Sequence, residues 1–297
     1  MNGILCVNKP AGFTSFDVVA KLRGILQTRK LGHGGTLDPM ATGVLPVFVG
    51  NSTKACDIMP DNTKSYRAGF RLGEVTDTQD VTGEVLSRSD VAVSEDMLRE
   101  TVPHFVGNIM QLPPMYSAVQ VNGQRLYDLA RKGVEVEREA REIQVSSIDI
   151  ISYDDEKREG VLDIACGKGT YIRTIINDIG EKLGCGGIMT SLVRTSSGGF
   201  TLADCFTFEQ IQQAKDEDRL EELILPIERV FAKLPKLRLN EAQTRMYRNG
   251  VKLDLKRVYN IKQGVTDYAV FGNDGKFIGT ALADFENDIL RVAKNLA

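Results

Sequence analysis

The residue types that build metal centres and disulfides are scarce in this chain. It has two histidines, His33 and His104, and five widely spaced cysteines with no Cys-x-x-Cys pair among them. A histidine-rich metal site is therefore excluded, and both a zinc site and a disulfide framework are disfavoured. We expect a protein that holds no metal ion and uses no cofactor.

Long apolar runs are also missing. No stretch of the 297 residues approaches the length of a membrane span, and Met1–Cys6 lacks the basic region and long apolar core of a signal peptide. The hydrophobic fraction of 42% is still sufficient for a packed core. We expect a cytoplasmic protein with no membrane partner, folded as one large or two smaller domains. Since no exposed apolar stripe is evident, we expect a monomer.

The net charge of −3 is unevenly distributed. Residues 1–73 hold nine Lys or Arg against four Asp or Glu, residues 74–229 hold sixteen against twenty-nine, and residues 230–297 hold twelve against seven. Both ends of the chain are therefore basic and the middle is acidic. Because binding of nucleic acid depends on the local potential, the negative total does not exclude it.

The segment Leu31–Gly43 gathers glycines and small residues around one histidine and one aspartate. Glycine permits close approach and unusual backbone angles, and Pro39 pushes Asp38 towards an extended conformation. The segment therefore predicts a defined loop that presents one carboxylate, although taken alone such a segment is more often an Asp-Pro turn than a catalytic site. It is neither a P-loop nor a dinucleotide fingerprint, because it lacks Gly-Lys-Ser/Thr and the Gly-x-Gly-x-x-Gly spacing.

Five blocks of the sequence, in the expected order, resemble the motifs of the TruB-type tRNA pseudouridine synthases. They lie between residue 3 and about residue 200, and five ordered blocks are very hard to explain by chance. One departure is Gly34, where other members of the family have threonine, and we expect it to leave the chemistry unchanged. The blocks are Asn8–Ser15, Gly32–Gly43, Lys64–Tyr66, Pro113–Val119 and Gly169–Thr174 with Asp178–Gly180.

The resemblance implies an isomerase that converts uridine 55 in the TΨC arm of tRNA to pseudouridine without metal or cofactor. Such an enzyme flips the base out of its stack and then cleaves and re-forms the glycosidic link. The resemblance also implies an α+β fold, the pseudouridine-synthase fold, in which a mixed, largely antiparallel sheet is flanked by helices and loops.

Three residues are the candidates for the chemistry around the carboxylate. Asp38 matches the nucleophilic aspartate of the family, and carboxylates attack or stabilise sugars in other glycoside chemistry. The sequence leaves open whether Asp38 attacks the sugar, attacks the base or removes a sugar proton. Arg173 matches an arginine that holds this carboxylate. Asp80 matches an aspartate that pairs with the arginine, and we assign it to a structural ion pair, with a direct catalytic role as the alternative.

The remaining candidates concern the nucleotide. Tyr66 matches a catalytic tyrosine that stacks on uracil and assists loss of the base proton, although without the resemblance it would be a core tyrosine on an alternating strand. His33 matches the histidine that fills the space left by the flipped base. Tyr171 and Leu192 match positions that line the nucleotide pocket, and Lys64, from the Lys-x-Tyr block, completes the substrate-binding set.

Sequence periodicity places these residues on predicted elements. Lys9 and Pro10 match the family's N-terminal motif, which the resemblance implies packs beneath the catalytic loop rather than doing chemistry. Thr14–Asp17 is a capping box that opens a helix. The predicted strands are Ile4–Val7, Val44–Val49, Ser65–Leu72, Gln144–Tyr153, Val161–Cys166 and Ile188–Arg194, and further helices are predicted at Gln124–Lys132, Tyr171–Leu183 and within Thr207–Leu223.

From about Arg229 short strands recur, with a hairpin turn at Asn273–Lys276. We therefore predict a catalytic domain at residues 1–228 and a small β-rich domain at residues 229–297. The resemblance implies that the second is a PUA-like RNA-binding domain, whose basic residues would contact phosphates. The strands predicted in it are Val251–Leu255, Asp267–Phe271, Phe277–Ala283 and Ile289–Val292.

Two other functions remain as alternatives. The basic ends and His33 would also suit an RNA-binding folding helper that opens and releases the tRNA elbow, and this interpretation would lead only if the catalytic carboxylate were absent. A glycosidase acting on small sugars would need a second acidic motif in a comparable loop, which the sequence does not supply.

Overall fold

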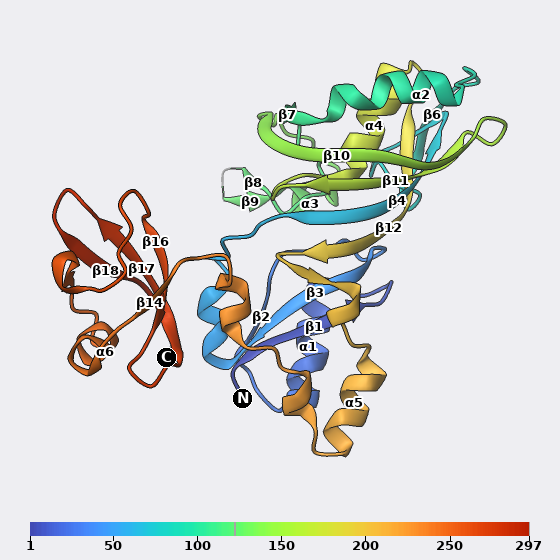
Figure 1. The fold of residues 1–297 in the computed structure, drawn as a ribbon. Helices are drawn as coiled ribbons and strands as arrows, with labels where there is room; N and C mark the ends of the chain where they lie inside the picture. The colour runs from blue at the N-terminus through green and yellow to red at the C-terminus, as the bar shows by residue number, and fades with distance from the viewer. Residues whose placement is uncertain (122, 297) are drawn as a thin grey trace.

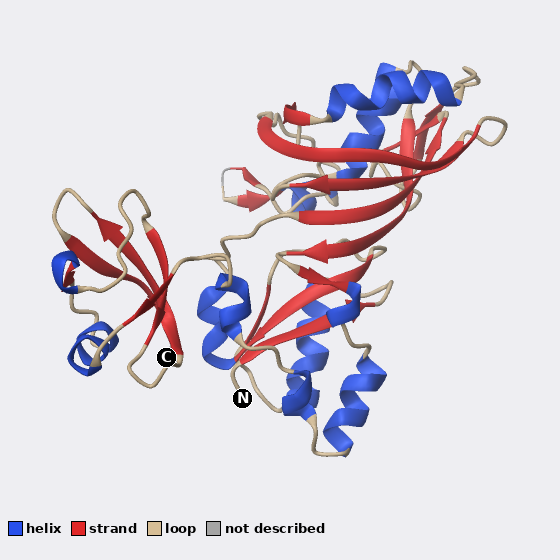
Figure 2. Cartoon of the chain, viewed as in Figure 1, coloured by secondary structure: helices blue, strands red, loops and turns tan. Residues whose placement is uncertain are grey.

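The structure is a computed structural model that describes residues 1–121 and 123–296. Two β-sheets organise these residues (Figure 1, Figure 2), a nine-stranded sheet on the right of the view and a five-stranded sheet on the left. Among the described residues, no helix has both the length and the apolar character to cross a membrane.

The large sheet is antiparallel except where β12 pairs in parallel with β3, through Val193 and Arg194. The mixed, largely antiparallel sheet predicted from the sequence is therefore confirmed. From one edge to the other, its strands are β1 (Gly3–Lys9), β3 (Thr42–Val49), β12 (Gly187–Ser197), β4 (Lys64–Leu72), β11 (Glu159–Cys166), β10 (Arg141–Asp154) and β7 (Gly107–Gln111), with β2 (Leu31–His33) on β3 and β13 (Phe200–Thr201) on β12. Two small hairpins are β5 (Glu74–Thr76) with β6 (Val85–Arg88), and β8 (Gln120–Val121) with β9 (Gln124–Arg125).

Helices flank this sheet, and the first begins at the predicted capping box. The hydroxyl of Thr14 accepts from the N–H of Asp17, whose carboxylate accepts from the N–H of Thr14. The α-helices are α1 (Ser15–Leu26), α2 (Glu95–Thr101), α3 (Leu126–Ala130), α4 (Ile172–Lys182), α5 (Phe208–Asp216) and α6 (Glu241–Arg248). The 3-10 segments are η1 (Gly50–Ala55), η2 (Val102–Phe105), η3 (Leu202–Asp204), η4 (Leu220–Leu223), η5 (Ile227–Phe231) and η6 (Leu255–Arg257).

Strand β1 is covered on both faces. Leu5 and Val7 join the core formed with α1 and α5, whereas Ile4 and Cys6 belong to a cluster that includes Phe271 of the small sheet. Successive side chains of a strand point to opposite faces, so an unbroken apolar run can be buried on both. A separate core fills the space between the other half of the sheet and α4.

The small sheet is the β-rich part predicted at the C-terminal end. It packs on the rest of the chain through a shared apolar cluster, in which Phe231 stacks on Phe277 with ring centroids 5.4 Å apart and Phe271 lies with Ile4 and Cys6 of β1. The domain boundary after residue 228 stays a prediction. The strand order is β14 (Lys236–Arg238), β16 (Asp267–Phe271), β17 (Phe277–Asp284), β18 (Ile289–Asn295) and β15 (Leu253–Asp254).

Several predicted strands extend further in the structure, such as β10 and β12, and two predicted elements are much shorter. The helix predicted at Gln124–Lys132 covers only Leu126–Ala130, because Gln124 and Arg125 pair with β8 in a hairpin. The strand predicted at Val251–Leu255 is reduced to Leu253–Asp254, because the Asp254 side chain caps the 3-10 turn that follows.

Candidate active site

The loop between β2 and β3 carries Asp38 and is fixed by side chains from three distant elements. The N–H of Leu37 donates to the hydroxyl of Ser15 at 2.9 Å, and the ammonium of Lys9 donates to the carbonyl of Pro39 at 3.2 Å. The guanidinium of Arg194 donates to the carbonyls of Thr36 and, at 3.4 Å, Gly35. The loop is therefore held at its backbone, which leaves its carboxylate available.

Lys9 and Arg194 are cations without solvent exposure beneath this loop. The ammonium of Lys9 also donates to the carbonyls of Pro10 and Phe13. The Nε atom of Arg194 donates to the carbonyl of Val44 at 2.7 Å. Burial lowers the pKa of Lys9 to about 8 and also lowers that of Arg194. Lys9 therefore packs beneath the catalytic loop, as the sequence predicted.

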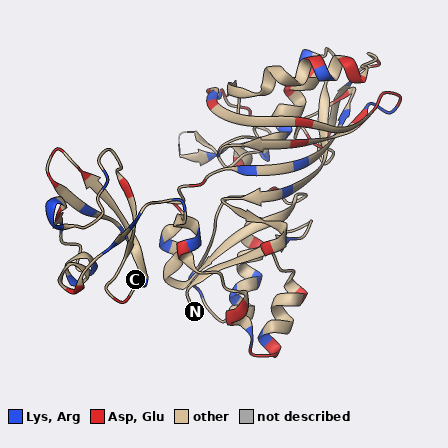
Figure 3. Ribbon diagram, viewed as in Figure 1, with Lys and Arg blue, Asp and Glu red and all other residues tan. Residues whose placement is uncertain are grey.

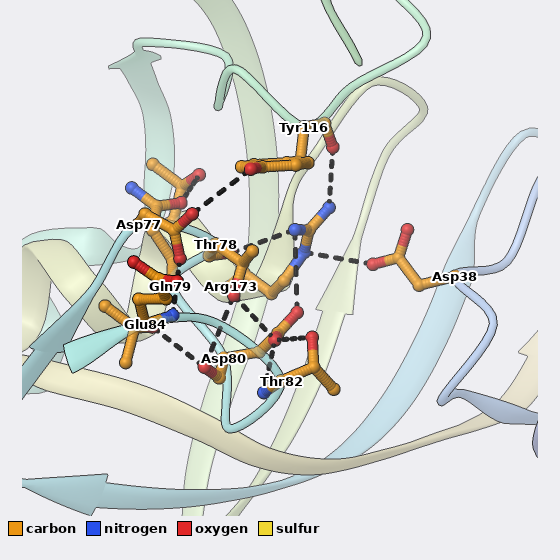
Figure 4. Close-up of polar contacts among 11 residues, drawn as sticks. Asp38, Asp77, Thr78, Gln79, Asp80, Thr82, Glu84, Tyr116 and Arg173 are labelled. Atoms are coloured by element: carbon orange, nitrogen blue, oxygen red, sulfur yellow. Dashed lines mark hydrogen bonds and ion pairs between the residues drawn. The ribbon is translucent and has the colours of Figure 1, made fainter. Parts of the chain in front are cut away.

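Asp38 meets the guanidinium of Arg173, which projects from the first turn of α4 (Figure 4). The Asp38 Oδ2 atom lies 3.0 Å from Nε of Arg173, and the two side chains are 35% and 6% exposed, respectively. Burial raises the pKa of Asp38, Arg173 and Lys9 lower it, and Asp80 raises it further. The site thus holds an accessible carboxylate that is more basic than an ordinary aspartate, which suits nucleophilic or general-base chemistry.

Asp80 lies on the far side of the same guanidinium, with Oδ2 3.6 Å from Nη1 of Arg173 and only 6% of its side chain exposed. Its other oxygen accepts from the hydroxyl of Thr78 and from both the N–H and the hydroxyl of Thr82. The structure therefore places Asp80 in an ion pair with Arg173, fixed in the turn between β5 and β6. Asp80 and Asp38 both pair with the same arginine, and the repulsion between the two carboxylates raises the pKa of Asp38.

Tyr66 and Leu192 lie on neighbouring strands of the large sheet. Tyr66 on β4 is directly opposite Arg194 on β12, and Leu192 is opposite Ala68. Both predicted residues are buried, and both belong to the same core cluster as Leu37 of the catalytic loop. Burial raises the pKa of Tyr66, which keeps the phenol protonated. Tyr66 and Leu192 therefore pack behind the loop that carries Asp38.

The other three predicted residues surround this region less closely. Lys64 reaches the catalytic loop, since its Nζ lies 3.5 Å from where a Cβ on Gly35 would be. His33 ends β2, and burial lowers its pKa, which favours the neutral ring. Tyr171 is half-buried at the start of α4, where its backbone N–H and carbonyl both bond the side chain of Gln111. No interaction of its ring with Tyr66 or Asp38 is present among the described residues.

Sequence reasoning missed Arg194. Among the described residues it heads the fully buried side chains by size, it bonds the loop that carries Asp38, and its charge acts on Tyr66 and Lys64. The signal was an arginine in the otherwise apolar strand predicted at Ile188–Arg194, where a buried guanidinium needs acceptors. Gly34 also has a physical reason, because a Cβ there would lie 3.2 Å from the ring of Phe48.

No metal site emerges from the side chains. Within residues 1–121 and 123–296, no group of three or more His, Cys, Asp or Glu could hold a metal ion.

Comparison with known proteins identifies the family. Residues 23–172 match the TruB family pseudouridylate synthase N-terminal domain, and residues 173–232 match the tRNA pseudouridylate synthase B C-terminal domain. A tRNA pseudouridine synthase B of Clostridium perfringens (strain 13 / Type A) is 43% identical over 287 residues, 96% of each chain. That of Alkaliphilus oremlandii (strain OhILAs) is 44% identical over 253 residues, 85% of this chain and 83% of the other.

Solved structures agree with this fold. The chain solved in "Crystal Structure of a Cbf5-Nop10-Gar1 Complex" superposes with a TM-score of 0.77 at 26% identity, covering 99% of this chain and 85% of that one. A chain from "Structure of H/ACA RNP bound to a substrate RNA containing 2'-deoxyuridine" gives a TM-score of 0.75 at 25% identity, with the same coverage. This chain therefore belongs to the TruB family of pseudouridylate synthases and is an isomerase that converts uridine to pseudouridine in tRNA.

Proposed function

We propose that this isomerase acts on uridine 55 in the TΨC loop of tRNA and that Asp38 is its catalytic carboxylate. The observation that carries the proposal is the geometry of Asp38. One of its oxygens is directed at a buried arginine, while the other points away from it (Figure 4), and the side chain is 35% exposed. A carboxylate fixed in this way can attack carbon, stabilise a cation-like sugar or accept a proton during cleavage of the glycosidic link.

The neighbouring side chains supply a place for a flipped uridine. Tyr66 would stack on the uracil ring and assist loss of its proton, and Leu192 would line the pocket with Tyr171. His33, as a neutral flat ring, would fill the space that the base leaves in the tRNA stack. This replacement compensates part of the roughly few kcal/mol that extrusion of a base costs. Lys64 would contribute positive charge near the nucleotide's phosphates.

The small sheet would bind a more distant part of the tRNA. Residues 229–297 form a PUA-like RNA-binding domain in this proposal, separate from the catalytic domain at 1–228. Lys and Arg residues lie on its α6 and η6 segments (Figure 3), including Arg245, Arg248, Lys256 and Arg257. Contacts of these cations with phosphates would add affinity that weakens with salt and reads little sequence.

The remaining parts of the proposal concern the setting of the reaction. The enzyme would work as a monomer, without metal or cofactor, in the cytoplasm. Its substrate is a tRNA, and its five cysteines are free thiols, as is typical of a reducing compartment.

The test is tritium release from an unmodified tRNA transcript whose uracils are tritiated at carbon 5. The wild-type protein should release tritium while the base stays in the chain, and a transcript with the TΨC-loop uridine replaced by cytidine should release none from that site. Asp38→Asn should fold, bind tRNA and release no tritium. Asp163→Asn, in an exposed ion pair with Arg67, is the matched control and should behave as wild type.

Other outcomes would reject parts of the proposal. Turnover by pure Asp38→Asn protein would remove Asp38 from its catalytic role. Release of free uracil without rejoining would indicate a glycosidase. Restoration of tRNA maturation in cells by Asp38→Asn would show that the folding-helper activity is a separate function of the same protein.

A further inference from the structure

The position of Arg173 is set by two loops as well as by two carboxylates. Its Nη1 atom donates to the carbonyl of Thr78 and its Nη2 atom to the carbonyl of Tyr116, both at 2.9 Å. Nε is thereby aimed at Asp38. The backbone carbonyls of residues 78 and 116 therefore fix the orientation of the guanidinium (Figure 4).

A side-chain hydrogen bond joins these two loops. The hydroxyl of Tyr116 donates to Oδ2 of Asp77 at 3.1 Å, while Oδ1 of Asp77 accepts from the N–H of Glu84 at 2.8 Å. Asp77 thus belongs firmly to the turn between β5 and β6, and Tyr116 belongs to the segment before β8. Burial and Asp77 raise the pKa of Tyr116, so its phenol stays a proton donor at neutral pH.

We propose that Asp77 and Tyr116 are positioning residues for catalysis, because their contact holds the two carbonyls that aim Arg173 at Asp38. This inference rests on the proposed catalytic role of Asp38. Neither residue touches Asp38 itself, so both act through the arginine.

The rest of the Tyr116 segment explains why this contact matters. Its other backbone groups bond within the segment or to residues that follow it, from the N–H of Ser117 to Met115, from the N–H of Tyr127 in α3 to Ser117 and from the guanidinium of Arg138 to the carbonyl of Pro113. They shape the segment and do not tie it to the β5–β6 turn. Without the Tyr116 hydroxyl, the carbonyl that accepts from Nη2 is free to shift, and displacements of about 1 Å at a reacting centre can reduce rates by as much as about a hundredfold.

A change in the orientation of Arg173 should also alter the acidic side of the pH–rate profile. The titratable and charged groups that interact with Asp38 are Arg173 from α4, Asp80 from the β5–β6 turn, Lys9 from β1 and the protonated phenol of Tyr66 from β4. Arg173 favours the ionised form of Asp38, so a poorly aimed arginine raises the pKa of this carboxyl. The pH at which turnover falls to half should therefore move upwards.

The experiment compares Tyr116→Phe with Tyr153→Phe in steady-state tritium release across pH. Tyr153 is a matched control, because its hydroxyl also makes one hydrogen bond, 3.0 Å to the carbonyl of Val93, and it stacks on Phe70 in the core. We expect kcat of Tyr116→Phe to fall about tenfold, with KM changed less than about twofold and the acid limb moved to higher pH. Tyr153→Phe should keep the wild-type kcat and pH profile.

A double-variant cycle gives a second readout. Asp77→Ala should lower kcat at least as much as Tyr116→Phe, and the combined variant should be no slower than Asp77→Ala alone. Wild-type kcat and pH profile in Tyr116→Phe, or an effect on KM alone, would overturn the inference. If Asp38→Asn is inactive in the same assay, the proposed function stands even where the inference about Asp77 and Tyr116 fails. If Asp38→Asn is active, the inference loses the catalytic role of Asp38 on which it rests.

Discussion

Replacing Asp80 by asparagine separates a structural ion pair from a direct catalytic role. Asparagine can keep Oδ1 as the acceptor for Thr78 and Thr82, so the substitution removes mainly the charge that faces Nη1 of Arg173. Both side chains of the pair are 6% exposed, which means that solvent cannot replace the lost partner.

The expected loss of stability follows from the distance. Two unit charges 3.6 Å apart attract by roughly 4–5 kcal/mol at an effective dielectric constant of about 20. Removing one partner of a buried pair costs about 3–5 kcal/mol in measured cases. Because Arg173 keeps Asp38 and two backbone carbonyls as partners, we expect the lower end, about 3 kcal/mol in the free energy of unfolding.

Urea unfolding at neutral pH measures this loss, and tritium release measures activity on the same preparation. Asp163→Asn is the control, since its pair with Arg67 is exposed and should contribute less than about 1 kcal/mol. Asp80→Asn should be clearly less stable and retain slow turnover, because Asp38 is still present. Complete loss of turnover with a destabilisation below about 1 kcal/mol would refute the structural assignment and make Asp80 a catalytic group.

Two further predictions concern the loop and its carboxylate. Arg194→Lys keeps the charge, but an ammonium cannot reproduce the fork that reaches Val44, Thr36 and Gly35. We expect a loss of about 2 kcal/mol and slower turnover, measured by thermal melting and tritium release; unchanged values would show that the loop does not depend on the fork. Burial raises the pKa of Asp38, so its contribution to stability is present below the ordinary carboxyl pKa and is lost as the pH rises through the folded-state pKa. Asp38→Asn should therefore melt at or above the wild-type temperature at about pH 7, with a smaller difference near pH 4, and a clearly lower melting temperature at neutral pH would contradict this reasoning.

The strands of both sheets could be predicted where apolar residues run together or alternate. Strand β16 has the predicted bounds Asp267–Phe271, and β1, β3 and β4 contain the predicted runs. These segments bury most of their residues, so the hydrophobic pattern and the structure report the same physical requirement.

Elements with little burial left no such pattern. Helix α6 buries only Thr244 and Tyr247, so it has no apolar stripe, and its one usable signal was the capping box from Asn240 to Gln243. Strand β7 is an edge strand with mostly exposed residues and was not predicted. Such elements are held by pairing and capping with distant parts of the chain, which periodicity does not record.

The candidate site was likewise predictable only in part. The motif resemblance could name Asp38 and Arg173, which lie in two of the five blocks, and Asp80, which lies in the short stretch Thr76–Asp80, but it could not say what aims the arginine. The guanidinium is contacted by residues 38, 78, 80 and 116, which only the fold brings to the start of α4. Five N–H donors in a rigid plane can serve two carboxylates and two carbonyls at once, whereas the three donors of a lysine cannot. The requirement for arginine at position 173 therefore comes from the number and the directions of its acceptors, and these are a property of the folded chain.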